Sequence, residues 1–539
     1  MNKDKDYTFR GWLLTLGVTL GVVALGLLPA VEVFGLRLER VDALSALKET
    51  HSAEEVVEYE ADMARLEEEL AAMTIAEEAV VDTLPVVVPT RYDWVVEDMA
   101  SEPRPRLTAA MVRPDTAQRV IAIEDFDSLP DSRFERLVER LAAGESVRIA
   151  FMGDSFVEGD ILTCDLRSEL QQLFGGRGVG FVPCDIPFAT VRRSVKRRAT
   201  NWSSYSIMKP KSAPERLRDK FSVSGYLSEG GARANVRWES VDMFPTLDSC
   251  SNARILLISR DSSSVQLTIN DTIYHRLDIA ADERLREIHI EAPIHSLAME
   301  VVEGKVVCYG ASLEADGGVV VDNFSVRSNN GHAIFGTSAA INRQVDEMLG
   351  YDMVVLQYGL NIMLPGQRNF SKYRDQLRDM IAYVERCFPN AVVLVMGVSD
   401  RWIKSEETGK YVPIGSVDAL TKYQRAAADS CNVAFWNTSA AMAELGGMPA
   451  FVSHGWAGGD YTHINYAGGK RVARALAAAL RQPVYELLLE RERVDSLREQ
   501  ERRYIEQMRS IGVSEVLPSI DNSGAMSIEK PVVEEELSW

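Results

Sequence analysis

Three short runs of almost uninterrupted apolar residues constrain the fold of this chain more than any other feature. They cover residues 147–152 (VRIAFM), 352–358 (DMVVLQY) and 391–398 (AVVLVMGV). Strands that are apolar on both faces are typical of a parallel sheet with helices packed on each side. Helical segments alternate with these strands, at 134–144, 162–175, 370–387 and 466–481. The alternation predicts an α/β domain with a parallel sheet.

A different pattern interrupts this α/β rhythm. Between residues 191 and 324 the chain consists of short strand-like runs divided by turn residues, with little helical periodicity. Examples are ARILLISR, SVQLTIND and KVVCYGASLE. Such a pattern predicts a β-sandwich. We therefore expect an α/β domain made of residues 118–190 and 325–482, with a β-sandwich of residues 191–324 inserted.

The two ends of the chain carry segments of a third kind. Residues 11–31 contain no charge and are long enough to span a bilayer as a helix, so residues 1–36 are predicted to be an N-terminal membrane anchor. A cleaved signal peptide is the rival interpretation, but the run is long for a signal core and lacks a clear cleavage site. Residues 37–117 are predicted to hold an exposed helix (53–79) and a Pro-rich linker (84–115), and residues 483–539 a charged helix and a tail.

Charge and cysteine content limit the functional classes. The formal net charge is −20, which argues against a general nucleic-acid binder, because such proteins need a basic surface. The six cysteines form no CxxC pair, so neither a zinc ribbon nor a thioredoxin motif is indicated. Two interpretations of the cysteines stay open: disulfides in an extracytoplasmic protein, or small buried hydrophobic residues.

A serine follows the first apolar run directly, in the stretch RIAFMGDSFVEGD (148–160). One interpretation is an ordinary strand-to-helix loop, in which Asp154 or Ser155 caps the next helix. The other is that Ser155 is a nucleophile at the carboxyl edge of the sheet. The stretch alone favours the cap, so the rest of the chain has to decide.

Downstream residues supply the groups that a serine nucleophile needs. His463 lies in DYTHINYAGG with Asp460 three residues before it, a spacing that lets the carboxylate accept a hydrogen bond from the imidazole Nδ1–H. Asn361 follows the second apolar run in YGLN, where its amide can donate to a developing oxyanion. Taken one by one, these residues also suit a loop hydrogen bond and a turn. His454 is a competing base, but no carboxylate lies close to it before Asp460.

Together these motifs resemble those of the SGNH (GDSL-type) hydrolase superfamily. The Ser block matches Gly153-Asp154-Ser155, the Gly-x-Asn block Gly359-Leu360-Asn361, and the Asp-x-x-His block Asp460 to His463. The resemblance covers a little under half of the chain. It implies a three-layer α/β/α fold with Ser155 as nucleophile, His463 as base and Asp460 orienting that base, and it implies neither a metal nor an organic cofactor.

The resemblance also implies an oxyanion hole made of the Ser155 N–H, the Asn361 side chain and a backbone N–H from a second block. In the matching stretch (323–331) Ser328 stands where the family usually has Gly, and Gly331 follows three residues later. Ile362 replaces the Asp that usually follows the Asn.

An interrupted core of this kind on an anchored chain is similar to bacterial peptidoglycan O-acetylesterases, which carry a carbohydrate-binding-module-like insert in the same place. This implies a single-pass protein of the bacterial inner membrane whose catalytic domain lies in the periplasm and removes O-acetyl groups from peptidoglycan or another polysaccharide. Two alternatives stay open. One is an O-acetyltransferase that works with a membrane-bound O-acyltransferase partner, and the other is a non-catalytic glycan-binding protein.

Two features of the insert have both a structural and a functional interpretation. Its aromatic residues are either core or sugar-stacking side chains, and core is the commoner fate; they include Trp202, Tyr205, Tyr226 and Trp238. The basic run at residues 192–198 (RRSVKRR) is either a solvated loop or a surface that meets an anionic glycan.

Overall fold

The computed structural model describes residues 90–97, 106–115, 119–187 and 192–511, and the backbone of four two- or three-residue strands outside these ranges. The chain divides into two units, Met1–Arg65 and Leu66–Trp539. In the first unit only β1 (Val31–Val33) and β2 (Leu36–Leu38) are described, and they pair antiparallel. The predicted membrane span (11–31, apart from its last residue) and the predicted helix (53–79) lie outside the described residues. In the described part of the chain we find no helix that is both long and apolar enough to cross a membrane.

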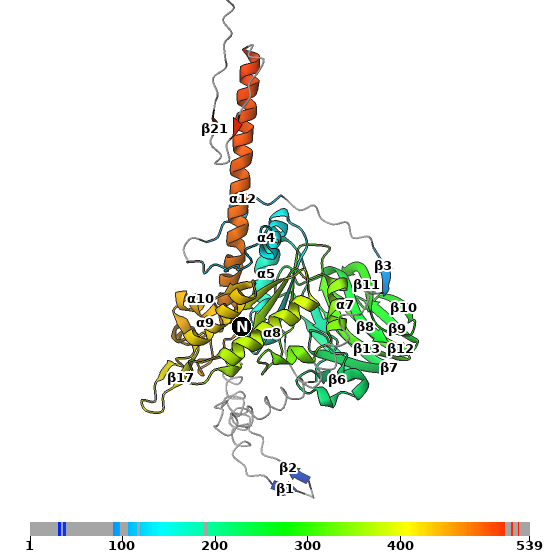
Figure 1. Ribbon diagram of the computed structural model, residues 1–539. Coiled ribbons are helices and arrows are strands. Elements are labelled where there is room, and N and C mark those ends of the chain that lie inside the picture. Colours follow the sequence, from blue (N-terminus) through cyan, green and yellow to red (C-terminus); the bar gives the residue numbers. More distant parts are fainter. Residues whose placement is uncertain are drawn as a thin grey trace, which may run out of the picture. The chain divides into compact units, whose positions relative to one another are not determined.

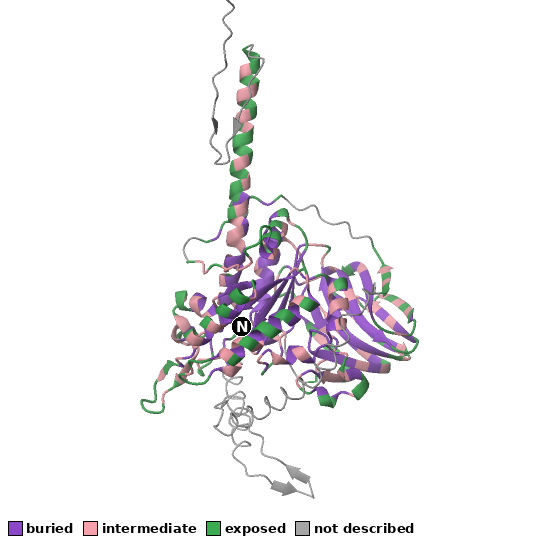
Figure 2. Ribbon diagram, in the orientation of Figure 1, coloured by how far each residue is buried: buried purple, intermediate pink, exposed green. Residues whose placement is uncertain are grey.

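Five parallel strands form the centre of the second unit (Figure 1). In spatial order they are β14 (Val319–Asn323), β4 (Val147–Gly153), β15 (Met353–Gln357), β16 (Val392–Met396) and β19 (Ala434–Trp436). Every residue of β4, β14, β15, β16 and β19 is buried, as Figure 2 shows for the purple strands. The continuous apolar runs in the sequence therefore form a sheet that is covered on both faces.

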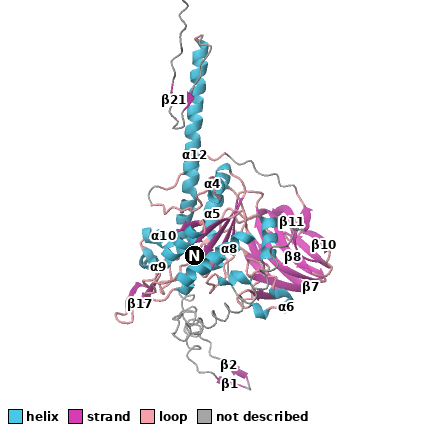
Figure 3. Cartoon of the chain, in the orientation of Figure 1, coloured by secondary structure: helices cyan, strands magenta, loops and turns pink. Residues whose placement is uncertain are grey.

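Helices cover both faces of this sheet (Figure 3). The chain steps from β4 to β14 through α5 (Thr163–Phe174) and then moves the opposite way through α7 (Ala339–Leu349), α8 (Ser371–Cys387) and α9 (Val417–Ser430). Because such crossovers are right-handed, a reversal of direction places α5 on one face and the other three helices on the opposite face. Helices α4 (Arg133–Ala143) and α12 (Tyr466–Ser510) pack on the α5 side. The predicted α/β domain thus has three layers.

Sequence signals place the ends of these helices. Ser132 precedes α4, and its hydroxyl accepts the Glu135 N–H at 3.0 Å while the Glu135 side chain accepts the Ser132 N–H. This reciprocal capping box satisfies N–H groups that have no partner inside the helix. The remaining helical turns are short: α3 (Ala109–Val112), α6 (Glu215–Arg218), α10 (Thr438–Glu444), α11 (Gly447–Ser453), and the 3₁₀ turns η3 (Glu158–Asp160), η4 (Pro210–Ser212), η5 (His332–Gly336) and η6 (Leu360–Ile362).

The inserted region is a strongly curved, mostly antiparallel sheet. The described strands follow the order β10-β9-β12-β7-β13-β8-β11-β3, with β5 on β13 and β6 on β7. Their bounds are β3 (Thr90–Val95), β5 (Gly180–Pro183), β6 (Lys196–Ser206), β7 (Tyr226–Glu239), β8 (Cys250–Ser259), β9 (Ser263–Ile269), β10 (Ile273–Ile279), β11 (Asp282–Ile294), β12 (Ser296–Glu303) and β13 (Lys305–Glu314).

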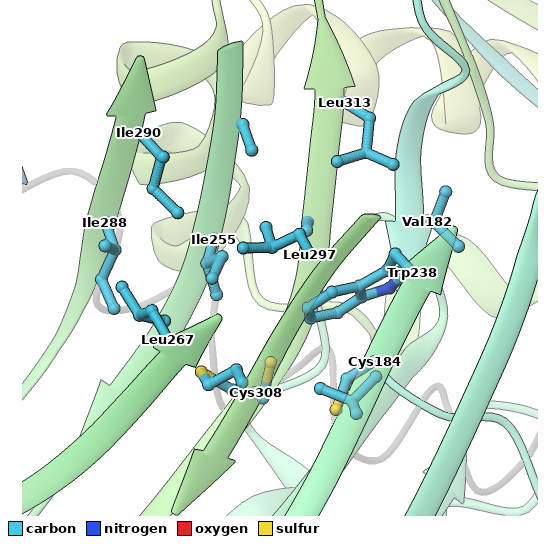
Figure 4. Close-up of a cluster of buried hydrophobic side chains, with 14 of the residues drawn as sticks. Val182, Cys184, Trp238, Ile255, Leu267, Ile288, Ile290, Leu297, Cys308 and Leu313 are labelled. Atoms are coloured by element: carbon cyan, nitrogen blue, oxygen red, sulfur yellow. The ribbon is translucent and has the colours of Figure 1, made fainter. Parts of the chain in front are cut away.

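This sheet folds over on itself around one hydrophobic core. Leu267 on β9 and Ile288 on β11 lie far apart in the strand order, yet both belong to the same buried cluster (Figure 4). The two end strands also meet, because the Trp94 ring on β3 stacks on the His275 ring on β10 with centroids 4.8 Å apart. Trp238 is fully buried in the cluster, as the core interpretation of this aromatic residue predicts. The insert therefore encloses its core between facing parts of the sheet, as a sandwich does.

Three predicted boundaries are wrong. Residues 319–323 were assigned to the insert but form β14 of the parallel sheet, and residues 180–183 were assigned to the α/β domain but form β5 of the insert. Residues 90–95 were assigned to an irregular linker but form β3, which pairs parallel with β11. The physical reason is the same in each case: a short apolar or alternating run predicts a strand but does not specify its partner.

The C-terminal part also differs from the prediction. The helix expected to end near residue 481 and the charged helix at 486–510 form one continuous helix, α12, with Pro483 inside it. The tail after residue 511 lies outside the described residues, apart from the paired strands β20 (Ser519–Ile520) and β21 (Met526–Ser527). All six cysteines are free thiols; five are buried and Cys431 is partly exposed, which agrees with the interpretation as small hydrophobic residues. A last short hairpin, β17 (Trp402–Lys404) and β18 (Tyr411–Pro413), lies after β16.

Candidate active site

Three of the loops that carry predicted site residues lie at one edge of the parallel sheet. Ser155 follows β4, the 324–331 segment follows β14, and Asn361 follows β15. Because the strands are parallel, their carboxyl ends share this edge, which is where α/β proteins place their sites. The sheet topology therefore brings together residues that are more than two hundred positions apart in the sequence.

Asp154, next to Ser155, organises the nucleophile loop. Its side chain is fully buried, and its Oδ1 accepts the Phe156 N–H at 2.9 Å. Burial raises the pKa of Asp154 to about 7, while the Phe156 N–H and the charge of His463 act in the opposite direction. The Tyr466 hydroxyl, three residues after His463, donates to the Gly159 carbonyl at 2.7 Å and so ties the segment after His463 to the segment after Ser155. Ser155 itself is partly exposed to solvent.

Asp460 and His463 form the predicted pair. The Asp460 Oδ2 and the His463 Nδ1 are 2.7 Å apart, and the Asp460 Oδ1 accepts the backbone N–H groups of Thr462 at 3.0 Å and of His463 at 3.1 Å. Burial alone would raise the pKa of Asp460, but these hydrogen bonds and the charge of His463 lower it to about 2. The ionised Asp460 carboxylate thus binds the Nδ1 side of the His463 imidazole. The other ring nitrogen, Nε2, faces away from Asp460.

The loop that carries this pair is held by the β17–β18 hairpin. The Trp402 N–H donates to the Tyr461 carbonyl at 3.0 Å, and the rings of Tyr411 and Tyr461 stack with centroids 3.9 Å apart. Tyr461 has a φ of 56°, which is uncommon for a residue other than glycine. Such backbone strain persists only where surrounding contacts enforce it, and it clusters at functional sites.

Asn361 reaches toward the nucleophile loop. Its Nδ2 donates to the Asn329 carbonyl at 3.0 Å and lies 3.4 Å from the Asp154 Oδ2. The preceding Gly359 has a φ of 133°, and a Cβ there would lie 3.2 Å from the Gln424 Nε2 and from the Leu420 Cδ2. Glycine is thus required at this position for both conformation and space. The three segments after β4, β14 and β15 are joined through Asn361.

The two candidates for the second block differ in geometry. Ser328 is exposed and has a φ of 60°, the left-handed conformation that glycine adopts most readily. Gly331 is buried, and its N–H already donates to the Asn329 Oδ1 at 2.9 Å. Ser328 thus has the backbone conformation of the glycine that this block usually contains, whereas the Gly331 N–H is engaged within its own loop.

The competing base His454 lies outside this arrangement. Its Nδ1 lies 2.7 Å from the Ala450 carbonyl, and its ring stacks on Trp456. No carboxylate contacts it among the described residues. Of the two histidines, only His463 has a carboxylate beside its Nδ1 in the described structure.

Two residues that the sequence reasoning missed support the site. The Gln357 Oε1 lies 3.4 Å from the Asp154 N, at the base of the nucleophile loop. The Arg401 Nη1 donates to the Leu360 carbonyl at 3.1 Å. Burial lowers the pKa of Arg401, and the negative charge of Asp460 partly offsets this effect. Arg401 follows a predicted strand end, a position that gives a weak sequence signal.

Comparisons with known proteins bear on the fold. A peptidoglycan O-acetylesterase structure is 20% identical to this chain, covers 67% of it and 99% of its own length, and superimposes with a TM-score of 0.55. The protein has the fold of this esterase.

Other comparisons add less. A family two carbohydrate esterase from Cellvibrio japonicus (11% identical, covering 54% of this chain and 98% of its own) and a lipase/acylhydrolase from Enterococcus faecalis (15% identical, covering 31% and 77%) each have a TM-score of 0.23. These overlaps are too low to support an argument. No protein-family model and no curated protein matches the sequence.

Proposed function

We propose that this protein is a serine esterase that removes O-acetyl groups from peptidoglycan or a related envelope polysaccharide. The observation that carries the proposal is the hydrogen bond between Asp460 and His463, on a loop whose following residue Tyr466 is hydrogen-bonded to Gly159, just after Ser155. The esterase fold described above supports the choice of substrate class.

In the first half of the reaction the Ser155 Oγ attacks the acetyl carbonyl carbon. The Nε2 of His463 takes the hydroxyl proton, and the ionised Asp460 stabilises the imidazolium that forms. The developing oxyanion accepts hydrogen bonds from the N–H groups of Ser155 and Ser328. The Asn361 amide also donates to it, by exchanging its long 3.4 Å contact with the Asp154 Oδ2 for one to the oxyanion. The C–O bond to the sugar then breaks, and His463 returns the proton to the sugar oxygen, which leaves acetyl-Ser155.

In the second half a water molecule attacks acetyl-Ser155 while His463 accepts its proton. Collapse of the intermediate releases acetate and restores the Ser155 hydroxyl. The side chain of His463 is 46% exposed, so water reaches the base directly. This exposure favours hydrolysis over transfer to a second sugar, because transfer requires that water be kept out of the site.

The location of the enzyme is a separate part of the proposal. The uncharged run at 11–31 supports a single-pass anchor in the bacterial inner membrane, with the catalytic domain in the periplasm. Its test is a protease-protection experiment on spheroplasts. Digestion of the domain from outside is the expected result, and full protection would contradict it.

The experiment that tests the activity measures acetate released from O-acetylated peptidoglycan by the full chain. The parent protein is expected to release acetate, whereas Ser155→Ala and His463→Ala are expected to lose activity by about 10³-fold or more. His454→Ala is the matched control and should retain activity. No release by the parent, or equal release by Ser155→Ala, would contradict the proposal.

A further inference from the structure

The basic run at the start of the insert lines a cavity beside the nucleophile loop. The cavity has a volume of about 310 Å³. Its lining includes Glu158 and Gly159, three and four residues after Ser155, and Ser325, three residues before Ser328. The opposite side is formed by the insert, with Tyr226 and four cationic residues: Arg192, Lys196, Arg197 and Arg198. The cavity therefore lies where the insert meets the candidate active site.

Contacts tie the basic run to the catalytic loops. The guanidinium of Arg193 lies 4.4 Å from the ring centre of Tyr466, which follows His463 by three residues. The Tyr466 hydroxyl in turn donates to the Gly159 carbonyl at 2.7 Å. The run is thus held against the site and is not simply a solvated loop.

Carboxylates balance only part of the positive charge on this wall. Lys196 is paired, because its Nζ lies 2.7 Å from the Glu239 Oε1. Arg192 lies 3.4 Å from Asp160, but the same carboxylate also pairs with Arg167 at 3.0 Å. Arg197 is 3.6 Å from Asp185, which is long for a charge-assisted hydrogen bond. No carboxylate pairs with Arg198 in the described part of the chain. This excess is notable in a protein whose net charge is −20.

Two buried polar atoms at the cavity lack a partner in the described structure. They are the Nε of Arg192, a donor, and the Oε1 of Glu158, an acceptor. The other Glu158 oxygen accepts from the Arg327 Nε at 2.6 Å. Because an unpaired buried polar group is costly, such atoms indicate a ligand that supplies both an acceptor and a donor. A sugar that carries a carboxylate and hydroxyl or amide groups has both.

We propose that this cavity is a subsite for a carboxylate-bearing sugar unit next to the acetylated one, and that the basic wall selects acidic glycans as substrates. Arg192, Arg197 and Arg198 would bind the carboxylate, and Glu158 would accept a hydrogen bond from the same sugar. The inference rests on the proposed function, because it assigns the substrate class for that site. It explains why cations are concentrated beside the nucleophile of an acidic protein.

The test is a binding measurement with the full-length Ser155→Ala protein, which does not turn over its ligand. Calorimetry compares an N-acetylglucosamine–N-acetylmuramic acid disaccharide with the same disaccharide after amidation of its carboxyl group. We expect amidation to raise the Kd about tenfold or more, the range of a charge-assisted hydrogen bond. Arg198→Gln, added to the Ser155→Ala protein, should weaken binding of the acid but not of the amide.

A matched control and a second readout separate the possible outcomes. Arg276→Gln changes an exposed arginine on β10 that does not line the cavity, and it should not alter either Kd. Equal affinity for acid and amide, or equal loss of both in Arg198→Gln, would overturn the subsite. Hydrolysis of p-nitrophenyl acetate by the parent is measured in parallel. If that ester is not cleaved but the acid still binds more tightly than the amide, the proposed function fails and the subsite stands. If the ester is cleaved but acid and amide bind equally, the subsite fails and the proposed function stands.

Discussion

Asp460 acts on the reaction through His463, so its carboxylate can be tested separately from the nucleophile. Asp460→Asn keeps the size of the side chain but removes the charge that stabilises the imidazolium. We expect kcat/KM for acetate release to fall by about 10²- to 10⁴-fold. The Tm should change little, because the Asp460 side chain is 40% exposed. Asp242→Asn, at an exposed aspartate of the insert, is the control, and an equal loss of activity in both variants would argue against the assigned role.

The raised pKa of Asp154 predicts that the stability of the protein depends on pH. Burial raises its pKa from 3.8 to about 7, so between these values the native state binds a proton that the unfolded state has released. The contribution of this group to the free energy of unfolding therefore falls as the pH rises through this window. Asp154→Asn cannot ionise and lacks this loss, so the Tm of the variant minus that of the parent should increase between about pH 4 and about pH 8.

Thermal unfolding followed by circular dichroism measures this difference across the pH range. Subtracting the parent at each pH removes the effects of other carboxylates, such as Asp460, whose lowered pKa gives the opposite dependence. A difference in Tm that is independent of pH would show that Asp154 is not protonated in the native protein.

Strand β3 tests the structure at the scale of an element. It lies far before the insert in the sequence but pairs with β11, and its Trp94 ring stacks on His275 of the opposite end strand. We expect Trp94→Ala to lower the free energy of unfolding by about 1–3 kcal/mol, through lost apolar burial and ring stacking. Val95→Ala, at a residue that is 54% exposed on the same strand, should change it by less than about 0.5 kcal/mol. Urea unfolding of the full chain measures both, and equal effects would contradict the pairing.

At the scale of the whole molecule, a buried ion network joins the insert to the α/β domain. Arg148 on β4 is buried, pairs with Glu314 at the end of β13, and donates to the Asp322 Oδ2 at 2.8 Å. Glu314 also lies 3.6 Å from Arg254 on β8. Burial alone would raise the pKa of Glu314, but the Arg148 and Arg254 charges lower it, so the carboxylate is ionised. Arg148, Arg254 and Glu314 line a cavity of about 760 Å³ at the amino ends of the parallel strands.

We expect Arg148→Met to lower the free energy of unfolding by about 3–5 kcal/mol, because it leaves two buried carboxylates without their partner. Arg284→Met removes a solvent-exposed arginine that pairs with Asp282 and should change the free energy of unfolding far less. Chemical denaturation of the full chain compares the two variants. Equal effects would mean that the network adds no more than a surface ion pair.

Local sequence patterns were sufficient for the centre of the fold and for part of the site. The apolar runs at 147–152, 352–358 and 391–398 predicted β4, β15 and β16, because a strand that is buried on both faces has few polar positions. The three-residue spacing of Asp460 and His463 predicted their hydrogen bond, because both partners lie in one loop. The left-handed conformation of Ser328 agrees with its predicted place in a block that usually has glycine.

Contacts between distant segments were decided by the tertiary structure alone. The sequence by itself determined which residues form strands, which strands end in chemically active side chains, and which pair lies close within one loop. It did not determine that residues 319–323 join β4, that residues 90–95 join β11, or that the basic run at 192–198 lines a cavity with Glu158 and Gly159. Strand patterns specify burial on each face but not the neighbouring strand, and a charged run has no periodicity that names its partner. Only packing of the complete chain selects those neighbours, because it must satisfy every buried backbone and side-chain group at once.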